Sequence, residues 1–540
     1  MRQSPGTMRL FRVWLVLAGV TFGALGQTNS VEVRKITLTD CIEIALQHNF
    51  DVQIQRYNPQ LARYAVNVAY GSYDPNFSIS GEHDAMTIPG GVDAQGRIYS
   101  GVDSQTDKFS SGLQGLLPWG LNYSVGASVA DQWGTKPGVT SDPNQPIIVT
   151  NTFYDVTAAA DRSFLSTNYA TIPSRFAFEN ASGSVGFLQL RQPLLKNLWI
   201  DSTRLQIILN KKSLEASEQA LRAQIMNSIT DVEKAYYNVI FAQDNIKVQQ
   251  KALELAERLV AENRKRVEVG ALAPLDEKQA ESQAAQSRAD LLAVEGTEGT
   301  QQRVLKSLLS DDYSKWEKVS IQPAEALVAV SQDLNLQESW RKGLTLRPDL
   351  VQQKISLEKQ GIIIKYQKNQ LLPQLDVIGT YGFNASSGGY GGTFDQLGNG
   401  SYPFWSVGGQ MTIPLTQTSA RNNYKSAKVT KEQIVLQLKQ LEQGILIQIE
   451  NAMAVARTSY QQVNATREAR IYAEAALDAE QKKLESGKST SFVVLQLQKN
   501  LTSASSSELR ALADYNIALA QLALNEGSTL DHRRVTLQVK

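Results

Sequence analysis

The chain repeats itself, and this duplication constrains its fold more than any other feature of its 540 residues. The segment LTDCIEIALQHNFDV is echoed 298 residues later by LQESWRKGLTLRPDL. Further along, Pro193 matches Pro414 after 221 residues, and Gly270 matches Gly487 after 217 residues. The order of these segments is the same in both halves, with about 77 extra residues (298 − 221) in the first. Two copies of one unit, the first with an insertion, explain the pattern.

Each copy is predicted to contain a helix, a β segment, a very long helix, a glycine turn and a helix of intermediate length. The first repeat covers residues 27–310: helix 38–71, a β-barrel segment with long loops 72–200, long helix 201–267 and helix 272–310. A linker or equatorial segment, 311–336, leads to the second repeat, 337–527. That repeat comprises helix 337–371, β segment 372–418, long helix 419–485 and helix 489–527, before a C-terminal tail, 528–540.

The long helices carry a seven-residue hydrophobic repeat, which favours a coiled-coil seam. Its positions are Val232, Val239, Ile246, Leu253, Val260 and Val267 in the first copy, and Ile449, Ala456, Val463, Arg470, Leu477 and Leu484 in the second. The next seam position is small or polar: Ala235, Ala242, Gln249 and Ala256. About 66 residues of helix make a rod of roughly 100 Å. A coiled-coil filament would explain the repeat, but not the glycine turns or the β segments.

Between the helices the hydrophobic period changes to two. The runs 121–129, 375–383 and 405–413 alternate apolar with small or polar residues, as strands of a membrane barrel do. Aromatic residues at strand ends would suit the two membrane interfaces. They are Trp119, Trp199, Phe404 and Trp405. The pair of runs 109–117 and 121–129 gives either four or six strands per chain, depending on whether it joins the barrel. Segments 84–107, 131–181 and 385–402 are predicted as long solvated loops because Gly, Pro, Asp, Asn and Thr dominate them.

The N-terminus and the composition exclude several classes of protein. Two arginines before an apolar stretch that ends at Gly26 predict a secretory signal over residues 1–26, with a buried helix as the alternative. Lys+Arg total 54 against 53 Asp+Glu, so no basic excess favours nucleic acid. A single cysteine, Cys41, excludes an intrachain disulfide and a Cys-rich zinc site. The three histidines have no ligand spacing and no catalytic motif is present, so we expect no enzyme, cofactor or metal site.

In the order and doubling of these segments, the mature chain resembles the TolC-like outer-membrane efflux protein family. The resemblance implies an α+β, mainly α fold: a long coiled-coil α-helical barrel with an outer-membrane β-barrel, built from two structurally repeated halves in a homotrimer. It implies an exit duct for efflux or type I secretion, located in the outer membrane with its helical part in the periplasm. The expected partners are outer-membrane lipid, a periplasmic adaptor (membrane fusion protein) and an inner-membrane pump.

The resemblance also implies a closable periplasmic tip at the two glycine turns. Matching positions are Gly270, Ala271, Leu272, Asp276 and Gln279 in the first copy, and Gly487, Lys488, Ser489, Val493 and Gln496 in the second. Aspartates that often line such an entrance in the family are replaced by Val493 and Gln496. Asp276 either lines the pore or stabilises the start of its helix.

Two interpretations of function follow. The first is a passive duct in which the helix pairs around the glycine turns move apart like an iris when the adaptor engages. The second is a periplasmic coiled-coil scaffold or adaptor without a pore. The exported substrate and the class of pump leave no mark in the sequence.

Overall fold

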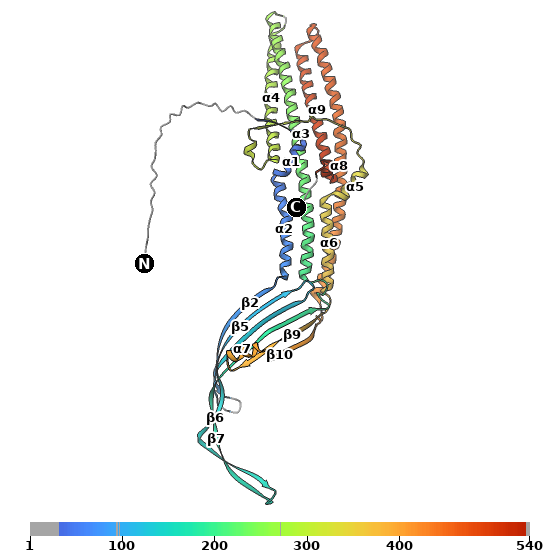
Figure 1. The fold of residues 1–540 in the computed structure, drawn as a ribbon. Helices are drawn as coiled ribbons and strands as arrows, with labels where there is room; N and C mark the ends of the chain where they lie inside the picture. The colour runs from blue at the N-terminus through green and yellow to red at the C-terminus, as the bar shows by residue number, and fades with distance from the viewer. Residues whose placement is uncertain (1–31, 93–95, 97, 271, 536–540) are drawn as a thin grey trace, which may run out of the picture.

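The computed structural model describes residues 32–92, 96, 98–270 and 272–535, so the predicted signal peptide and residues 536–540 of the tail lie outside the described residues. The molecule is elongated: paired long helices form one end, a curved sheet follows, and a two-stranded arm projects from the sheet (Figure 1). It is mainly helical, with strands concentrated in that one sheet. Within the described ranges, no helix is both long and apolar enough to cross a bilayer.

Two helical hairpins form the wall of the molecule. They are α3 (Ser202–Glu268) with α4 (Pro274–Leu309), and α8 (Thr418–Glu485) with α9 (Ser491–Glu526). Shorter helices continue the wall toward the sheet: α1 (Leu38–His48), α2 (Phe50–Tyr70), α5 (Leu336–Leu346) and α6 (Pro348–Asn369). In the half away from the sheet the helices lie in the order α4, α3, α9, α8. In the half next to the sheet the order is α2, α3, α6, α8, so α8 forms one edge throughout.

The prediction of a single first helix in each copy is wrong. In the first copy the helix stops at Asn49, whose side-chain oxygen accepts hydrogen bonds from the N–H groups of Asp51 and Val52 and so begins α2. In the second copy the break lies at Arg347, because Pro348 disfavours helical geometry in the residue before it and suits the first position of a new helix.

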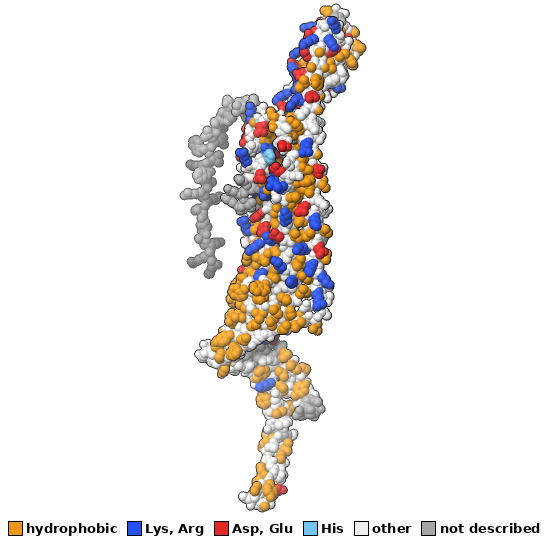
Figure 2. Space-filling view, turned by 90° about the vertical axis from the view of Figure 1, so that its right-hand side faces the viewer, with side chains coloured by type: hydrophobic (Ala, Val, Ile, Leu, Met, Phe, Trp, Pro, Cys, Tyr) orange, Lys and Arg blue, Asp and Glu red, His pale blue; other side chains and the backbone are white. Residues whose placement is uncertain are grey.

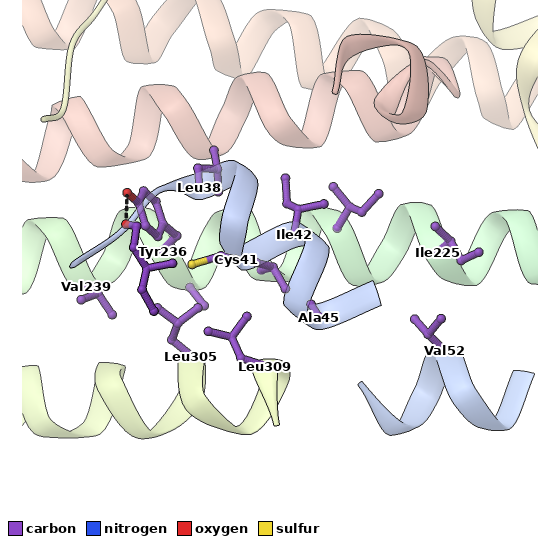
Figure 3. Packing of buried hydrophobic residues seen from close by; sticks show 14 of the residues in the cluster. Leu38, Cys41, Ile42, Ala45, Val52, Ile225, Tyr236, Val239, Leu305 and Leu309 are labelled. Atoms are coloured by element: carbon purple, nitrogen blue, oxygen red, sulfur yellow. Dashed lines mark hydrogen bonds between the residues drawn. The ribbon is translucent and has the colours of Figure 1, made fainter. Parts of the chain in front are cut away.

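The main core lies where α1 packs between α3 and α4 (Figure 3). Leu38, Cys41 and Ile42 of α1 are buried there against residues of α3 such as Ile225. Tyr236 of α3 is fully buried, and its hydroxyl donates a hydrogen bond of 3.2 Å to the carbonyl of Ile36. Burial raises the pKa of the Cys41 thiol to about 12. This core fixes the first copy's short helices to its long ones.

The heptad seam is buried to different depths along the rods. Val232 and Val239 of α3 are fully buried, as are Ile449, Ala456 and Val463 of α8. The remaining α3 positions of the seam are half-buried: Ile246, Leu253, Val260 and Val267. The reason is the second layer that α1, β8 (Val319–Pro323) and α10 (Thr529–His532) add around the middle of α3. Among the residues described, no such layer covers α3 nearer the glycine turn.

The middle of the molecule ties the two copies and the C-terminal segment together. β1 (Glu32–Ile36) pairs in parallel with β8, which belongs to the segment between the copies. The buried carboxylate of Glu233 in α3 forms an ion pair with Arg533, just after α10. The equatorial segment is therefore an ordered belt rather than a loose linker.

The sheet has six antiparallel strands in the order β10-β9-β7-β6-β5-β2. Their bounds are β2 (Asn76–Ile88), β5 (Val102–Leu116), β6 (Asn122–Asp155), β7 (Ala160–Pro193), β9 (Gln374–Ser387) and β10 (Tyr402–Thr412). A small ribbon, β3 (Gly91–Val92) with β4 (Ile98–Tyr99), lies between β2 and β5. The runs at 109–129 therefore join the same sheet as the other strands, which settles the choice between four and six strands in favour of six.

The three segments predicted as loops are largely structured. Residues 131–155 and 160–181 extend β6 and β7 into the projecting arm, and 390–398 form a short helix, α7 (Tyr390–Gly398). Strands β2 and β5 also take up part of 84–107. The prediction failed because a two-stranded ribbon satisfies its backbone hydrogen bonds whatever its side chains are, and needs no hydrophobic alternation.

The two faces of the sheet differ in chemistry. One residue from each strand forms an apolar row across all six: Phe77, Leu113, Val125, Leu188, Tyr381 and Trp405. A row on the opposite face is polar apart from its last ring: Ser80, Ser110, Ser128, Ser184, Asn384 and Tyr402. Figure 2 shows charged side chains over the helical part of one side of the molecule and mostly hydrophobic ones where the helices approach the sheet.

Candidate functional site: the two glycine turns

Both long helices end in a glycine with left-handed backbone geometry. The φ angle is 72° at Gly270 and 71° at Gly487. The N–H of Gly487 donates to the carbonyl of Leu484 at 3.1 Å, and the N–H of Lys488 donates to Lys483 at 2.9 Å, which closes the helix end. At the first turn, the N–H of Gly270 donates to Val267 at 2.9 Å. Glycine is needed because a side chain is strained at such φ angles.

A buried amide links three helices at this end of the molecule. Asn263 of α3 is fully buried, and its Nδ2 donates to the carbonyl of Asp276 in α4 at 3.2 Å. Its Oδ1 accepts a hydrogen bond of 2.9 Å from the Ser491 hydroxyl in α9. A second link runs from the Arg266 guanidinium to the carbonyl of Leu484, at 3.4 Å. The two hairpins of one chain are therefore joined beside their turns.

A carboxylate braces the second turn at the matching place in the repeat. Glu480 lies 217 residues after Asn263, the same spacing that separates the two glycines. It accepts a hydrogen bond of 2.6 Å from the Ser489 hydroxyl and pairs with Lys483 at 2.9 Å. These two partners hold the pKa of Glu480 below its ordinary value. The brace of the first turn is thus neutral, whereas that of the second is charged.

The structure brings the sequence-predicted tip residues to one end of the molecule, with different exposure. Gly270, Gly487, Lys488, Val493 and Gln496 are exposed. Leu272, Asp276, Gln279 and Ser489 are half-buried, and Ala271 lies outside the described residues. Asp276 belongs to the first turn of α4, where a carboxylate interacts favourably with the helix dipole.

Sequence reasoning missed the braces and an apolar patch at the tip. Asn263 has a signal in the sequence: it continues the small or polar seam series of Ala242, Gln249 and Ala256, and a lone amide at a seam position is typical of a specifying contact. The tip patch consists of four exposed apolar side chains: Val269, Leu275, Phe492 and Val493. An exposed group of this kind at the end of a rod is typical of a protein contact.

The remaining chemistry candidates stay isolated. His48 contacts Asp311 at 2.9 Å, and His83 contacts Asp107 at 2.7 Å, far apart in the fold. In the described part of the chain, no group of three or more His, Cys, Asp or Glu side chains could hold a metal ion.

Comparison with known proteins identifies the architecture. The family model for outer membrane efflux proteins matches residues 157–310 and 341–528, one stretch in each copy of the repeat. The chain belongs to the outer membrane efflux protein family. The outer membrane protein TolC of Vibrio cholerae is 24% identical over 327 residues, which are 58% of this chain and 70% of that protein.

Solved structures share the fold of this efflux protein. The CmeC outer membrane channel of Campylobacter jejuni matches with a TM-score of 0.61 and 16% identity, covering 96% of this chain and 94% of that one. The open state of the MtrE outer membrane channel of Neisseria gonorrhoeae matches with a TM-score of 0.60 and 15% identity, covering 91% and 89%.

The predicted family, function class and location are therefore confirmed. This efflux protein is an outer-membrane channel whose helical part lies in the periplasm, and it is a passive conduit rather than an enzyme. Channels of the family form trimers and work with efflux partners.

Proposed function

We propose that three copies of this chain assemble into one duct, in which the sheets close a single outer-membrane β-barrel and the helices form a hollow cylinder. The duct is gated at the glycine turns and works with a periplasmic adaptor and an inner-membrane pump. The observation that carries the assembly is the open sheet: β2 and β10 each pair on one side only within the described residues. A membrane-spanning sheet needs every backbone group paired, so its two edges must meet other copies.

The helical edges support the same assembly. α2 carries an exposed apolar stripe at the spacing of a helix seam: Ile54, Tyr57, Leu61, Tyr64 and Val68. The opposite edge helix, α8, exposes Val429 and Leu436, seven residues apart. Seams of this kind on both edges of the wall suit the packing of α2 from one copy against α8 of the next.

The gate that we propose is an iris with the described contacts as its closed state. Asn263 with Ser491, and Arg266 with Leu484, join the two hairpins of one chain, so the hairpins separate only when these hydrogen bonds break. The adaptor would supply the compensating contacts, with the tip patch and the predicted positions Ala271, Leu272, Lys488 and Ser489 as its docking surface. Three copies of Asp276 would add carboxylates near the entrance.

A disulfide across the hairpins tests the gate. In an Asn263→Cys/Ser491→Cys variant the two cysteines replace side chains that already touch, at 2.9 Å. We expect oxidation to hold single-channel conductance low and to stop efflux, and reduction to restore both. The control is Gln249→Cys/Ser506→Cys, which joins α3 to α9 at a contact of 3.4 Å farther from the turns. Normal efflux with the first pair oxidised, or equal inhibition by both pairs, would contradict a gate at the turns.

A further inference from the structure

The first copy carries a strand pair that the second copy lacks. In the second copy, β9 follows α6 and β10 precedes α8, and these two strands are direct neighbours. In the first copy, β2 follows α2 and β7 precedes α3, yet β5 and β6 lie between them. The neighbouring helices α2 and α3 thus lead to strands that are separated by two others.

The side-chain pattern of β5 and β6 is that of the other four strands. Leu113 and Val125 continue the apolar row between Phe77 and Leu188. Ser110 and Ser128 continue the polar row on the opposite face, where the Ser80 and Ser110 hydroxyls are 2.7 Å apart and those of Ser128 and Ser184 are 3.0 Å apart. A strand pair outside the membrane wall would not need to match lipid on one face and water on the other at this register.

The turn between β5 and β6 is seated against the start of α3. Gly120 has φ +90°, and a Cβ there would lie 3.0 Å from Nη2 of Arg204. Arg204 is itself held by Asp201 at 2.7 Å and donates to the carbonyl of Asn197 at 2.7 Å. The adjacent Trp119 is exposed, like Trp199 in the connection from β7 to α3, as suits aromatic side chains at a membrane interface.

The two strands also bring the sheet to the width of the helical wall. Strands about 4.8 Å apart and tilted by about 40° each take roughly 6 Å of a barrel's circumference, so six strands span about 38 Å. Four helices packed about 9.5 Å apart also span about 38 Å. Four strands alone would span only about 25 Å and would require a narrower barrel.

We propose that β5 and β6 line the pore, so that the membrane section of the duct is as wide as its helical tunnel and passes solutes of the same bulk. The inference rests on the three-chain duct proposed above. Three chains with six strands each give a barrel of 18 strands. Its backbone diameter is roughly 36 Å and its open lumen roughly 25 Å, in the range where barrels hold a water-filled channel. The cargo class is bulky molecules, excluded at the tip rather than at the membrane.

Single cysteines test whether the hairpin lines the pore. The natural thiol, Cys41, is buried and serves as the silent background. A charged, membrane-impermeant methanethiosulfonate should reduce the conductance of Ser110→Cys and Ser128→Cys as it does that of Ser184→Cys on β7, and should leave Leu113→Cys unchanged. Block of Ser184→Cys without any effect at Ser110→Cys and Ser128→Cys would overturn the inference while leaving the duct intact. Absence of discrete conductance in the unsubstituted protein would overturn the duct itself.

Polymer exclusion measures the width. The arm is first shortened by replacing residues 137–175 with Asn-Gly, because Lys136 and Phe176 are paired across its two strands. Polyethylene glycol with a hydrodynamic radius of about 10 Å, added on the outer side, should enter an 18-stranded lumen and lower the conductance. Exclusion of that polymer, with entry only of ones of about half the radius, would indicate a four-strand wall per chain and overturn the inference.

Discussion

The two copies of the repeat are nearly identical in their helices and very different in their strands. α3 and α8 have 67 and 68 residues, α4 and α9 both have 36, and α1 and α5 both have 11. Between the helices, the second copy has β9, α7 and β10, whereas the first has β2, β5, β6 and β7 with a long arm. The helices must match in length because they lie side by side in one wall. A sheet accepts extra strands in pairs, since a hairpin returns the chain to the side from which it left.

The largest expected contrast between the copies concerns a buried charge. Glu233 is buried and paired with Arg533, while the matching residue 217 positions later, Glu450, is exposed. Glu233→Ala leaves the guanidinium without its partner and should lower the free energy of unfolding by about 3 kcal/mol. Glu450→Ala should change it by less than about 0.5 kcal/mol. Chemical unfolding in detergent measures both, and equal losses would mean that the ion pair is not what distinguishes the copies.

The next contrast concerns a close helix contact in the second copy. A Cβ on Gly343 of α5 would lie 2.4 Å from Cδ1 of Ile449, whereas the matching residue in the first copy is Ala45. Gly343→Ala should destabilise the protein by about 1–2 kcal/mol because the core is overpacked, although alanine favours helix. The control is Gly361→Ala in α6, where nothing lies within 4 Å of the added Cβ. That variant should gain up to about 1 kcal/mol, and a loss at Gly361 comparable to that at Gly343 would contradict the steric explanation.

A smaller contrast is expected in the response of the two turns to pH. The pKa of Glu480 is lowered by Ser489 and Lys483. Its contribution to stability is therefore complete above the ordinary value of 4.5 and is lost as the pH falls through the lowered value. Asn263 does not titrate. Hydrogen exchange at acidic pH should become faster at the second turn but not at the first, relative to Glu480→Gln at the same pH. Equal acceleration at both turns, or at the second turn of the variant, would contradict this.

The smallest effect concerns a thiol. Cys41 lies in the apolar core of the first copy, whereas its match, Ser339, donates a hydrogen bond to Glu526 in the second. With a pKa of about 12, Cys41 remains a neutral, buried thiol at pH 9. We expect no labelling by a maleimide in the native protein and full labelling after denaturation. Rapid labelling of native protein would show that this core opens.

The sequence predicts the helices better than the strands, for a physical reason. The seven-residue repeat in residues 201–267 reports packing against a neighbour, and α3 lies there. Gly270 and Gly487 could be predicted as turns because a left-handed backbone favours glycine. The break at Asn49 was also visible, since Asn is a common N-cap, but it was overlooked within a continuous apolar pattern.

The arm and the tip braces were harder to predict. Residues 131–181 pair with each other without burying a core, so their composition resembles that of a loop. The tip depends on contacts between distant segments, such as Asn263 with Ser491, 228 residues apart. Position in a seam indicates that Asn263 is unusual, but not which hydroxyl it meets. Nothing in the local sequence of Phe492 indicates that it stays exposed.

The unpaired edges β2 and β10 make insertion a collective event. A lone chain cannot satisfy both edges by itself, so the productive step is an encounter between copies, and its rate depends on how many of them wait at the membrane. A copy with a damaged β10 edge would still offer an intact β2 edge to a healthy neighbour and occupy its place in the ring. Co-expression of such a chain should therefore poison assembly dominantly, through defective closure rather than loss of its own transport.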